Sequence, residues 1–279
     1  MFRHILVPLD GSLRAERAIP VATRLARASG GMLILLRAVK AAPEFGSETS
    51  TGSQLFQTAI QSELTEALNY LTEIASSSQL SGLPLTVLAP QGSVIATIQE
   101  VIHTYQVDLL VCCEQSLAGA QQFLGSFAEQ LGQHLTIPFL LLPEQDHTLA
   151  EWQGPLTCLV AFAGAQPESC LIQPAVSLLA SQTERETGHL HFAPLRSVAA
   201  SSTAICSDQQ GTAPASEPAR RSAVLLKEAR TEQQVERGSQ HLQNEIIVLG
   251  MPLRDGDQEA LLDLCAYPRL FVPSLVESK

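Results

Sequence analysis

The sequence predicts an α/β protein made of two doubly wound, parallel-sheet domains of the Rossmann-like kind. Short, continuously apolar runs alternate with amphipathic helical segments, which is typical of parallel strands buried on both faces. The chain is 45% hydrophobic and 16% charged, which is enough apolar material for a sizeable core. The pattern occurs twice, as an internal repeat of about 130 residues. A length of 279 residues also favours about two domains.

The first expected strand, His4 to Leu9, ends in a tight turn at Asp10-Gly11-Ser12. Ser12 is a suitable N-cap for a helix from Leu13 to about Ala28, in which Pro20 predicts a kink. Gly30-Gly31 ends that helix.

The rest of the first half continues the same alternation of strand and helix. The elements expected are a strand at 32–39, a loop at 41–53, a helix at 54–77, a strand at 83–88, a helix capped by Ser93 and ending near Tyr105, a strand at 109–113, a helix at 126–135 and a strand at 138–142. Right-handed crossovers between such strands leave few topologies.

After a linker at 151–155 the pattern restarts, so we expect domains at 1–145 and 155–279. The second half shows strand patterns at 156–165, 189–194, 223–229, 245–250 and 269–273, and helical patterns at 167–181 and 231–243. The stretch 196–221 is rich in Ser, Ala and Pro and has no apolar periodicity, which predicts a disordered insert.

Composition excludes several classes of function. The net charge of −11 argues against nucleic acid and anionic membranes as partners. No apolar run approaches the roughly 20 residues of a membrane span. The N-terminal segment enters a strand pattern without a signal peptide's apolar region, so we expect a cytoplasmic protein. The six cysteines lack metal-binding spacing, and we expect buried, reduced thiols.

In a doubly wound sheet the ligand crevice lies beyond the carboxyl ends of the strands. That rule places Asp10, Ala38 and the loop from Cys112 to Ser126 around one crevice. Gly125-Ser126 directly precedes a helix, where free backbone N–H groups favour an anion. A cap that only starts the helix is the alternative interpretation of the same two residues.

Several motifs of the first half resemble the universal stress protein family. They are ILVPLDGS at 5–12, LLRAV at 35–39, QGS at 91–93, DLLV at 108–111, and LGS at 124–126 followed by IPFLLLP. The resemblance covers residues 1–145 and implies a five-stranded sheet of order 3-2-1-4-5. In one branch of the family it also implies ATP binding through a G-x2-G-x9-G-[S/T] loop.

By this resemblance the nucleotide-site residues are Leu9, Asp10, Ala38, Gly125, Ser126 and Phe127. Counting back from Gly125 places Cys112 and Gln115 where the family has its first two loop glycines. Side chains there block the close approach of backbone to phosphate. The loop carries no Lys or Arg, and Glu114 adds a repelling charge. We therefore expect at most weak adenine-nucleotide binding and no certain cofactor, with Mg-ATP as the candidate.

The second half resembles a degenerate domain of the same family. Ala163 stands in the position of Asp10 and Ala165 in that of Ser12, so no nucleotide site is expected there. His189 and His191 alternate on one strand, but two ligands are too few for a metal site. No nucleophile signature or catalytic constellation is present, so we expect the protein not to be an enzyme.

Three hypotheses follow for function. The first is a tandem, non-catalytic stress-response or signalling module, its halves joined as a pseudo-dimer by pairing of 138–142 with 269–272. A homodimer and an unidentified protein partner remain alternatives. The second is an ATP-binding, slowly hydrolysing switch that uses the first-half site. The third, an enzyme of the wider adenine nucleotide alpha hydrolase-like group, lacks the pyrophosphate loop after the first strand.

Overall fold

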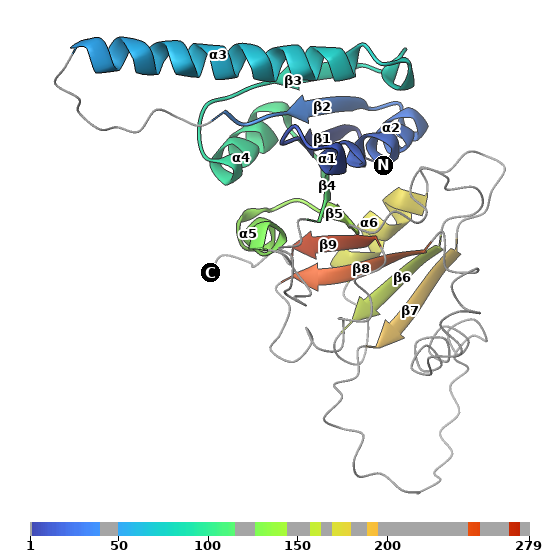
Figure 1. Ribbon diagram of the computed structural model, residues 1–279. Helices are drawn as coiled ribbons and strands as arrows, with labels where there is room; N and C mark the ends of the chain where they lie inside the picture. The colour runs from blue at the N-terminus through green and yellow to red at the C-terminus, as the bar shows by residue number, and fades with distance from the viewer. Residues whose placement is uncertain are drawn as a thin grey trace, which may run out of the picture.

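The computed structural model of the chain describes residues 2–39, 50–114, 126–143, 157–162, 169–179, 189–194, 245–251 and 268–273 (Figure 1). Within these residues the strands form one nine-stranded sheet of order β3-β2-β1-β4-β5-β9-β8-β6-β7. Outside the described residues lie the strand predicted at 223–229 and the helix predicted at 231–243. So do the linker 151–155, the insert 196–221, Cys206 and Cys265.

The first half of the sheet confirms the predicted α/β fold and its strand order 3-2-1-4-5. Its strands are β1 (His4–Pro8), β2 (Met32–Leu36), β3 (Leu85–Leu88), β4 (Leu109–Cys113) and β5 (Phe139–Leu142). All neighbouring pairs among them are parallel. The order reverses between β1 and β4, and this is the place where such sheets open a crevice at their carboxyl ends.

The second half contributes β6 (Thr157–Phe162), β7 (His189–Pro194), β8 (Glu245–Met251) and β9 (Arg269–Pro273), also parallel to one another. β5 and β9 pair antiparallel, with Leu140 opposite Leu270. We expected 138–142 to pair with 269–272, and through this pairing the described strands of both halves form a single sheet. An apolar edge strand left open is costly, and this pairing covers two such edges at once.

The predicted helix from Leu13 to about Ala28 is divided into two. α1 (Leu13–Glu16) and α2 (Ala18–Ser29) are separated at Arg17. Pro20 has no N–H to donate to the carbonyl of Glu16, so a continuous helix would lack that bond. With the break at Arg17, Pro20 falls in the first turn of α2, where no intrahelical donor is needed. The interruption therefore lies three residues before the proline rather than at it.

Helices cover both faces of the sheet. The other described helices are α3 (Ser50–Ala75), α4 (Val94–Tyr105), α5 (Ser126–His134) and α6 (Ser169–Leu179), with a short 3-10 helix η1 (Ser78–Leu80) after α3. Residues of α2, α3 and α6 belong to the same hydrophobic cluster as Ile5 and Val7 of β1. Residues of α4 and α5 belong to a second cluster together with Leu6, which points to the opposite face. The chain thus builds three layers around a shared sheet.

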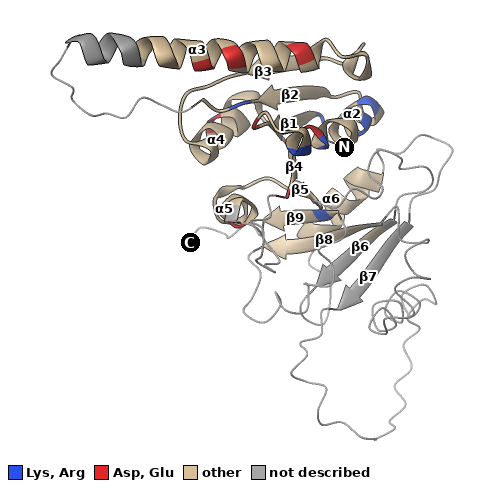
Figure 2. Cartoon of the chain, viewed as in Figure 1, with Lys and Arg blue, Asp and Glu red and all other residues tan. Residues whose placement is uncertain are grey.

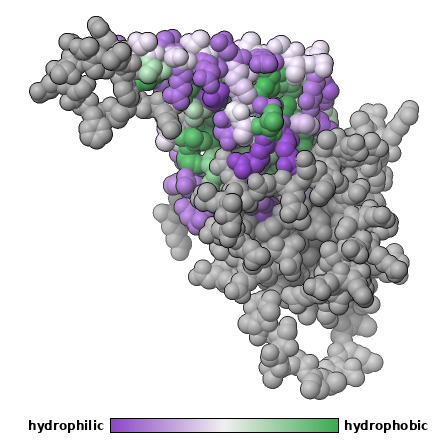
Figure 3. Space-filling model, viewed as in Figure 1, coloured by the Kyte–Doolittle hydropathy of each residue, from purple (hydrophilic) through white to green (hydrophobic). Residues whose placement is uncertain are grey.

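The long helix α3 touches the sheet through one end. Its buried residues Ala67 and Leu71 lie in its C-terminal half. Its N-terminal half extends past the strands in Figure 1. Figure 2 shows acidic residues at intervals along α3, and the residues coloured along the top of Figure 3, where α3 lies, are mostly hydrophilic or near neutral.

Cys112, Cys113 and Cys158 are buried free thiols and Cys170 is partly buried, as expected for these four. Across the described helices, no segment is both long and apolar enough to cross a membrane.

The end of α2 generates a stability prediction. Gly30 adopts a left-handed conformation, with φ of 61°, and has open space where a Cβ would lie. A Cβ on the neighbouring Gly31 would lie 2.5 Å from the backbone oxygen of Arg3. We expect Gly31→Ala to cost about 3 kcal/mol, because backbone on both sides prevents a local adjustment. The matched variant Gly30→Ala should cost about 1 kcal/mol from backbone strain. Urea denaturation compares them, and equal losses would contradict the close approach.

Candidate functional site

The turn after β1 forms one wall of the candidate site. The amide of Leu9 donates to the carbonyl oxygen of Leu36 at 2.7 Å, which ties the turn to the end of β2. Gly11 adopts φ of 86°, a conformation that glycine accepts without strain. Asp10 accepts hydrogen bonds from the Ser12 amide at 2.9 Å and the Ser12 hydroxyl at 2.5 Å. The Ser12 hydroxyl oxygen accepts in turn from the amide of Ala15 and caps α1.

These contacts keep Asp10 ionised. Partial burial alone would raise the pKa of its carboxyl group, but the hydrogen bonds from Ser12 and the charge of Arg14 outweigh burial and hold the pKa below its usual value. Asp10 is exposed at the carboxyl edge of the sheet. Its carboxylate is therefore a fixed acceptor for a hydroxyl or amino group of a ligand.

Ala38 lies at the same edge, just past the end of β2. The Arg37 amide donates to the carbonyl of Leu88, and Val39 forms a bridge with Gln91. These two anchors hold the half-buried Ala38 between them. The structure thus brings Leu9, Asp10 and Ala38 to one edge of the sheet, as predicted.

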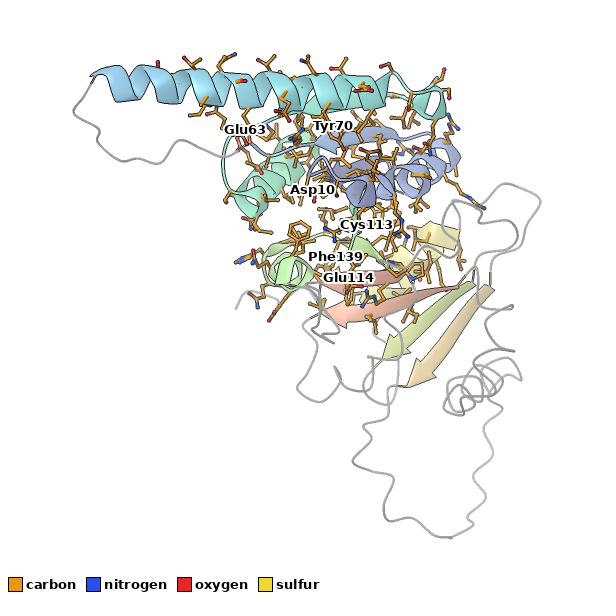
Figure 4. The ribbon with its side chains drawn as sticks, viewed as in Figure 1. Asp10, Glu63, Tyr70, Cys113, Glu114 and Phe139 are labelled. Carbon is orange, nitrogen blue, oxygen red and sulfur yellow. The ribbon has the colours of Figure 1, made fainter. Side chains whose placement is uncertain are left out.

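A polar network next to Asp10 was not predicted. The Arg37 guanidinium lies 5.1 Å from the centre of the Tyr70 ring and 3.5 Å from the carboxylate of Glu66. The Tyr70 hydroxyl donates to Glu16 at 2.9 Å. Burial, followed by the bond and charge of Glu16, raises the pKa of Tyr70, which stays protonated. Figure 4 shows Tyr70 on α3 and Asp10 on the turn below it.

The guanidinium of Arg37 also lies close to the turn itself. A Cβ built on Gly11 would come within 3.5 Å of it. The network therefore joins the Asp10 turn, the end of β2 and α3 on one side of the crevice. Its members are far apart in the sequence and carry no shared motif. Only Tyr70, a polar-tipped aromatic within a helical apolar stripe, offered a signal that sequence inspection could have used.

At the end of β4 the structure places two buried thiols. Burial raises the pKa of both, with Cys113 at about 11. Both thiols are therefore protonated near neutral pH and are poor nucleophiles. Cys112, in the position of a family glycine, has 3% of its surface exposed. Its side chain packs in the core on the α4 and α5 side of the sheet.

Glu114, the next residue, differs from expectation. The sequence suggested a free charge that would repel phosphate. In the structure its carboxylate bonds Arg269 of β9 at 2.5 Å, and the side chains are 7% and 0% exposed. The repelling charge is thus paired with an arginine from the other half of the sheet.

Two further arginines lie near the end of β4 although the loop itself carries none. Burial raises the pKa of Cys113, and the charges of Arg17, which follows α1, and of Arg14 in α1 act against it. Arg14 also acts on Asp10. The positive charge near the crevice therefore comes from α1 and the residue after it, a source that inspection of the loop sequence missed.

The remaining predicted residues fall at the loop and its helix. Gln115 and Gly125 lie outside the described residues. Ser126 is the first residue of α5, and Phe127 packs partly buried against the core beside it. In the part of the chain that the structure describes, no three His, Cys, Asp or Glu side chains gather as a metal site requires.

Comparisons with known proteins agree with this geometry. The sequence model described as the universal stress protein family matches residues 1–143. The "Universal stress protein in QAH/OAS sulfhydrylase 3'region" of Thermus aquaticus is 30% identical over 144 residues, 51% of this chain and 99% of that protein.

Solved structures of universal stress proteins align with this chain to different extents. A universal stress protein from Archaeoglobus fulgidus aligns with 97% of this chain and 96% of its own, with a TM-score of 0.58 and 13% identity. One from Arabidopsis thaliana, solved with AMP bound, covers 50% of this chain and 90% of its own, with a TM-score of 0.34 and 12% identity.

The Asp10 turn predicts a pH-dependent effect. Asp10 has a lowered pKa in the folded state, so its stabilisation is present above the unfolded value of about 3.9 and is lost as pH falls through the folded pKa. Ser12→Ala removes both the cap and a bond to the carboxylate. We expect a loss of about 1 kcal/mol at neutral pH that shrinks below about pH 4.

Ser93→Ala provides the control, because Ser93 caps α4 through the amide of Ala96 at 3.4 Å. Its cost should stay constant over the same pH range. Urea unfolding at several pH values measures both, and an NMR titration should show the Asp10 pKa rising in Ser12→Ala. A constant cost for Ser12→Ala would contradict the role of its bond to Asp10.

Proposed function

Because the chain belongs to the universal stress protein family, we propose that it is a non-catalytic stress-response or signalling module with at most weak adenine-nucleotide binding in its first half. The observation that carries the proposal is a contrast between the two ends of the crevice. The end formed by β1 and β2 suits a base and ribose. The end formed by β4 does not suit a triphosphate.

At the first end, the ionised Asp10 accepts hydrogen bonds at a fixed position. The half-buried Ala38 supplies apolar surface near it, and the buried Leu9 anchors the start of the turn in the core. A small side chain at 38 leaves room for a flat ring, and a carboxylate suits ribose hydroxyls or an exocyclic amine. These residues fit the nucleoside part of an adenine nucleotide.

At the second end, β4 ends in Cys112 and Cys113, and Glu114 follows. Glycines would let backbone N–H groups approach phosphate closely, and buried side chains stand in place of at least the first of them. Arg269 already pairs with Glu114, so the guanidinium charge of Arg269 is used by that carboxylate rather than by a phosphate. A polyphosphate gains little here beyond the attraction of Arg14 and Arg17.

Arg14 and Arg17 favour the alternative, an ATP-binding and slowly hydrolysing switch. Their charges reach Cys113 at the end of β4. Bound ATP with Mg²⁺ would bring the phosphoryl chemistry, and this chain's described residues would orient the nucleoside through Asp10. The alternative requires that these arginines outweigh the missing glycines.

We also propose that the second half is a degenerate domain of the same family, joined to the first as an intramolecular pseudo-dimer. The strand order β7-β6-β8-β9 repeats the order β2-β1-β4-β5. Antiparallel pairing of β5 with β9 relates the two sets by an approximate twofold axis. The long alignment with the Archaeoglobus fulgidus fold supports this arrangement.

One prediction separates the two candidate functions. Protein purified without added nucleotide should carry far less than one adenine nucleotide per chain, measured after denaturation. In thermal-shift titrations, Mg-ATP and AMP should stabilise the protein to a similar small extent, because the polyphosphate adds little. A ligand at a hundred times its Kd adds about 2.7 kcal/mol, so tight binding would be plain.

Asp10→Asn should abolish whatever shift is seen, whereas Glu73→Gln, an exposed acid on α3, should leave it unchanged. Near-stoichiometric nucleotide in the purified protein, or Mg-ATP binding at least about tenfold (1.4 kcal/mol) tighter than AMP, would establish the switch instead.

A further inference from the structure

The centre of the nine-stranded sheet has an approximate twofold symmetry. Leu140 and Leu270 face each other across β5 and β9, with Phe139 opposite Phe271 and Leu141 opposite Arg269. β4 lies behind β5 as β8 lies behind β9. Leu110 pairs with Phe139 in the first half, and Ile247 pairs with Arg269 in the second. Phe139 and Arg269 therefore occupy equivalent positions in the two halves.

The same register makes Glu114 equivalent to Met251. Each lies four residues beyond the equivalent pair Leu110 and Ile247. The two halves thus differ in charge at matching places. The first half carries the acid Glu114 and the neutral Phe139. The second carries the neutral Met251 and the base Arg269.

These unequal positions meet across the junction. Arg269 bonds Glu114, and both side chains are buried. Phe139 stacks on Phe271, with ring centres 4.9 Å apart. Met251 reaches α5, where a Cβ on Gly132 would lie only 2.1 Å from its terminal carbon. Figure 4 shows Glu114 and Phe139 near the meeting of β5 and β9.

We propose that the Glu114–Arg269 pair is a specificity determinant, which makes β5 pair with β9 of its own chain rather than with β5 of a second copy. In a β5–β5 pair of the same register, Phe139 of the copy would stand where Arg269 stands. Each Glu114 would then lose its guanidinium while buried. In a β9–β9 pair, Met251 of the copy would stand where Glu114 stands, and each Arg269 would lose its carboxylate.

Buried pairs of this kind contribute little net stability compared with apolar residues, but breaking one is costly. Their effect is therefore on the choice of partner, since both like-with-like pairings lose this ion pair at two places. An apolar edge such as β5, with residues buried on both faces, would otherwise accept any similar strand. The inference concerns assembly and does not depend on nucleotide binding.

The test exchanges each charged residue for the one at its equivalent position. Glu114→Met and Arg269→Phe are made in the full chain, singly and together. Each single variant should raise the unfolding equilibrium constant by roughly a hundredfold or more, because one buried charge loses its partner. The double variant should recover to near the parent protein. Urea denaturation completes this double-mutant cycle.

Partner choice is tested by mixing. Glu114→Met and Arg269→Phe chains with different tags are unfolded together and refolded. A pair of chains that exchange halves has one Glu114–Arg269 junction and one uncharged junction, so both mismatches are relieved. We expect a 1:1 complex carrying both tags, detected by tandem affinity capture and light scattering. The controls are differently tagged parent chains and differently tagged Glu114→Met chains. Both controls should form far less of the complex that carries both tags.

Two results would overturn the proposal. One is a double variant no more stable than the single variants, which would show that the two side chains are not coupled. The other is mixed complex formed no more often from the complementary variants than from Glu114→Met with itself. If the single variants do not fold alone, folded complex obtained by refolding them together would still support the proposal. Absence of folded complex after co-refolding would contradict the proposal.

Discussion

The antiparallel pairing of β5 with β9 is the constraint on which the rest of the structure depends. Each strand would be an apolar edge without the other, and parallel strands need cover on both faces. Because the two edges join, one hydrophobic cluster contains β1 and α2 of the first half together with α6, β8 and β9 of the second. The second cluster likewise unites α4 and α5 with β8 and β9. Each hydrophobic cluster therefore continues across the boundary between the two halves.

Much of the first half could be predicted because its signals are local. Continuous apolar runs gave the strands, and the serines before α1 and α4 gave their caps, which both accept from a helix amide. The predicted kink was placed at Pro20 rather than at Arg17, because the effect of a proline depends on which turn of the helix contains it. The 26-residue length of α3 was underestimated, since its first turns carry few apolar residues to mark them.

In the candidate site, too, features encoded locally could be predicted and long-range contacts could not. The Asp10 turn is encoded within three residues, Asp-Gly-Ser, and was found from them. The pairing of Glu114 with Arg269 spans 155 positions and needs the register of β9, which no local pattern contains. Arg37 and Tyr70 meet only because α3 packs over the end of β2. Sequence inspection therefore identified the acid of the candidate site and missed the charges that surround it.

The buried ion pair gives the second half a role that needs no ligand of its own. The first half holds an acid at the end of β4, directly before its loop, and the matching base lies on β9. Were the first half alone, Glu114 would lose that guanidinium, and water or another cation would have to take its place beside the carboxylate. The constraint acts on β8 and β9 and not on the residues that follow β6. In the degenerate second domain that we propose, Ala163 stands where the first half has Asp10, and the strands that complete the partner are kept without that acid.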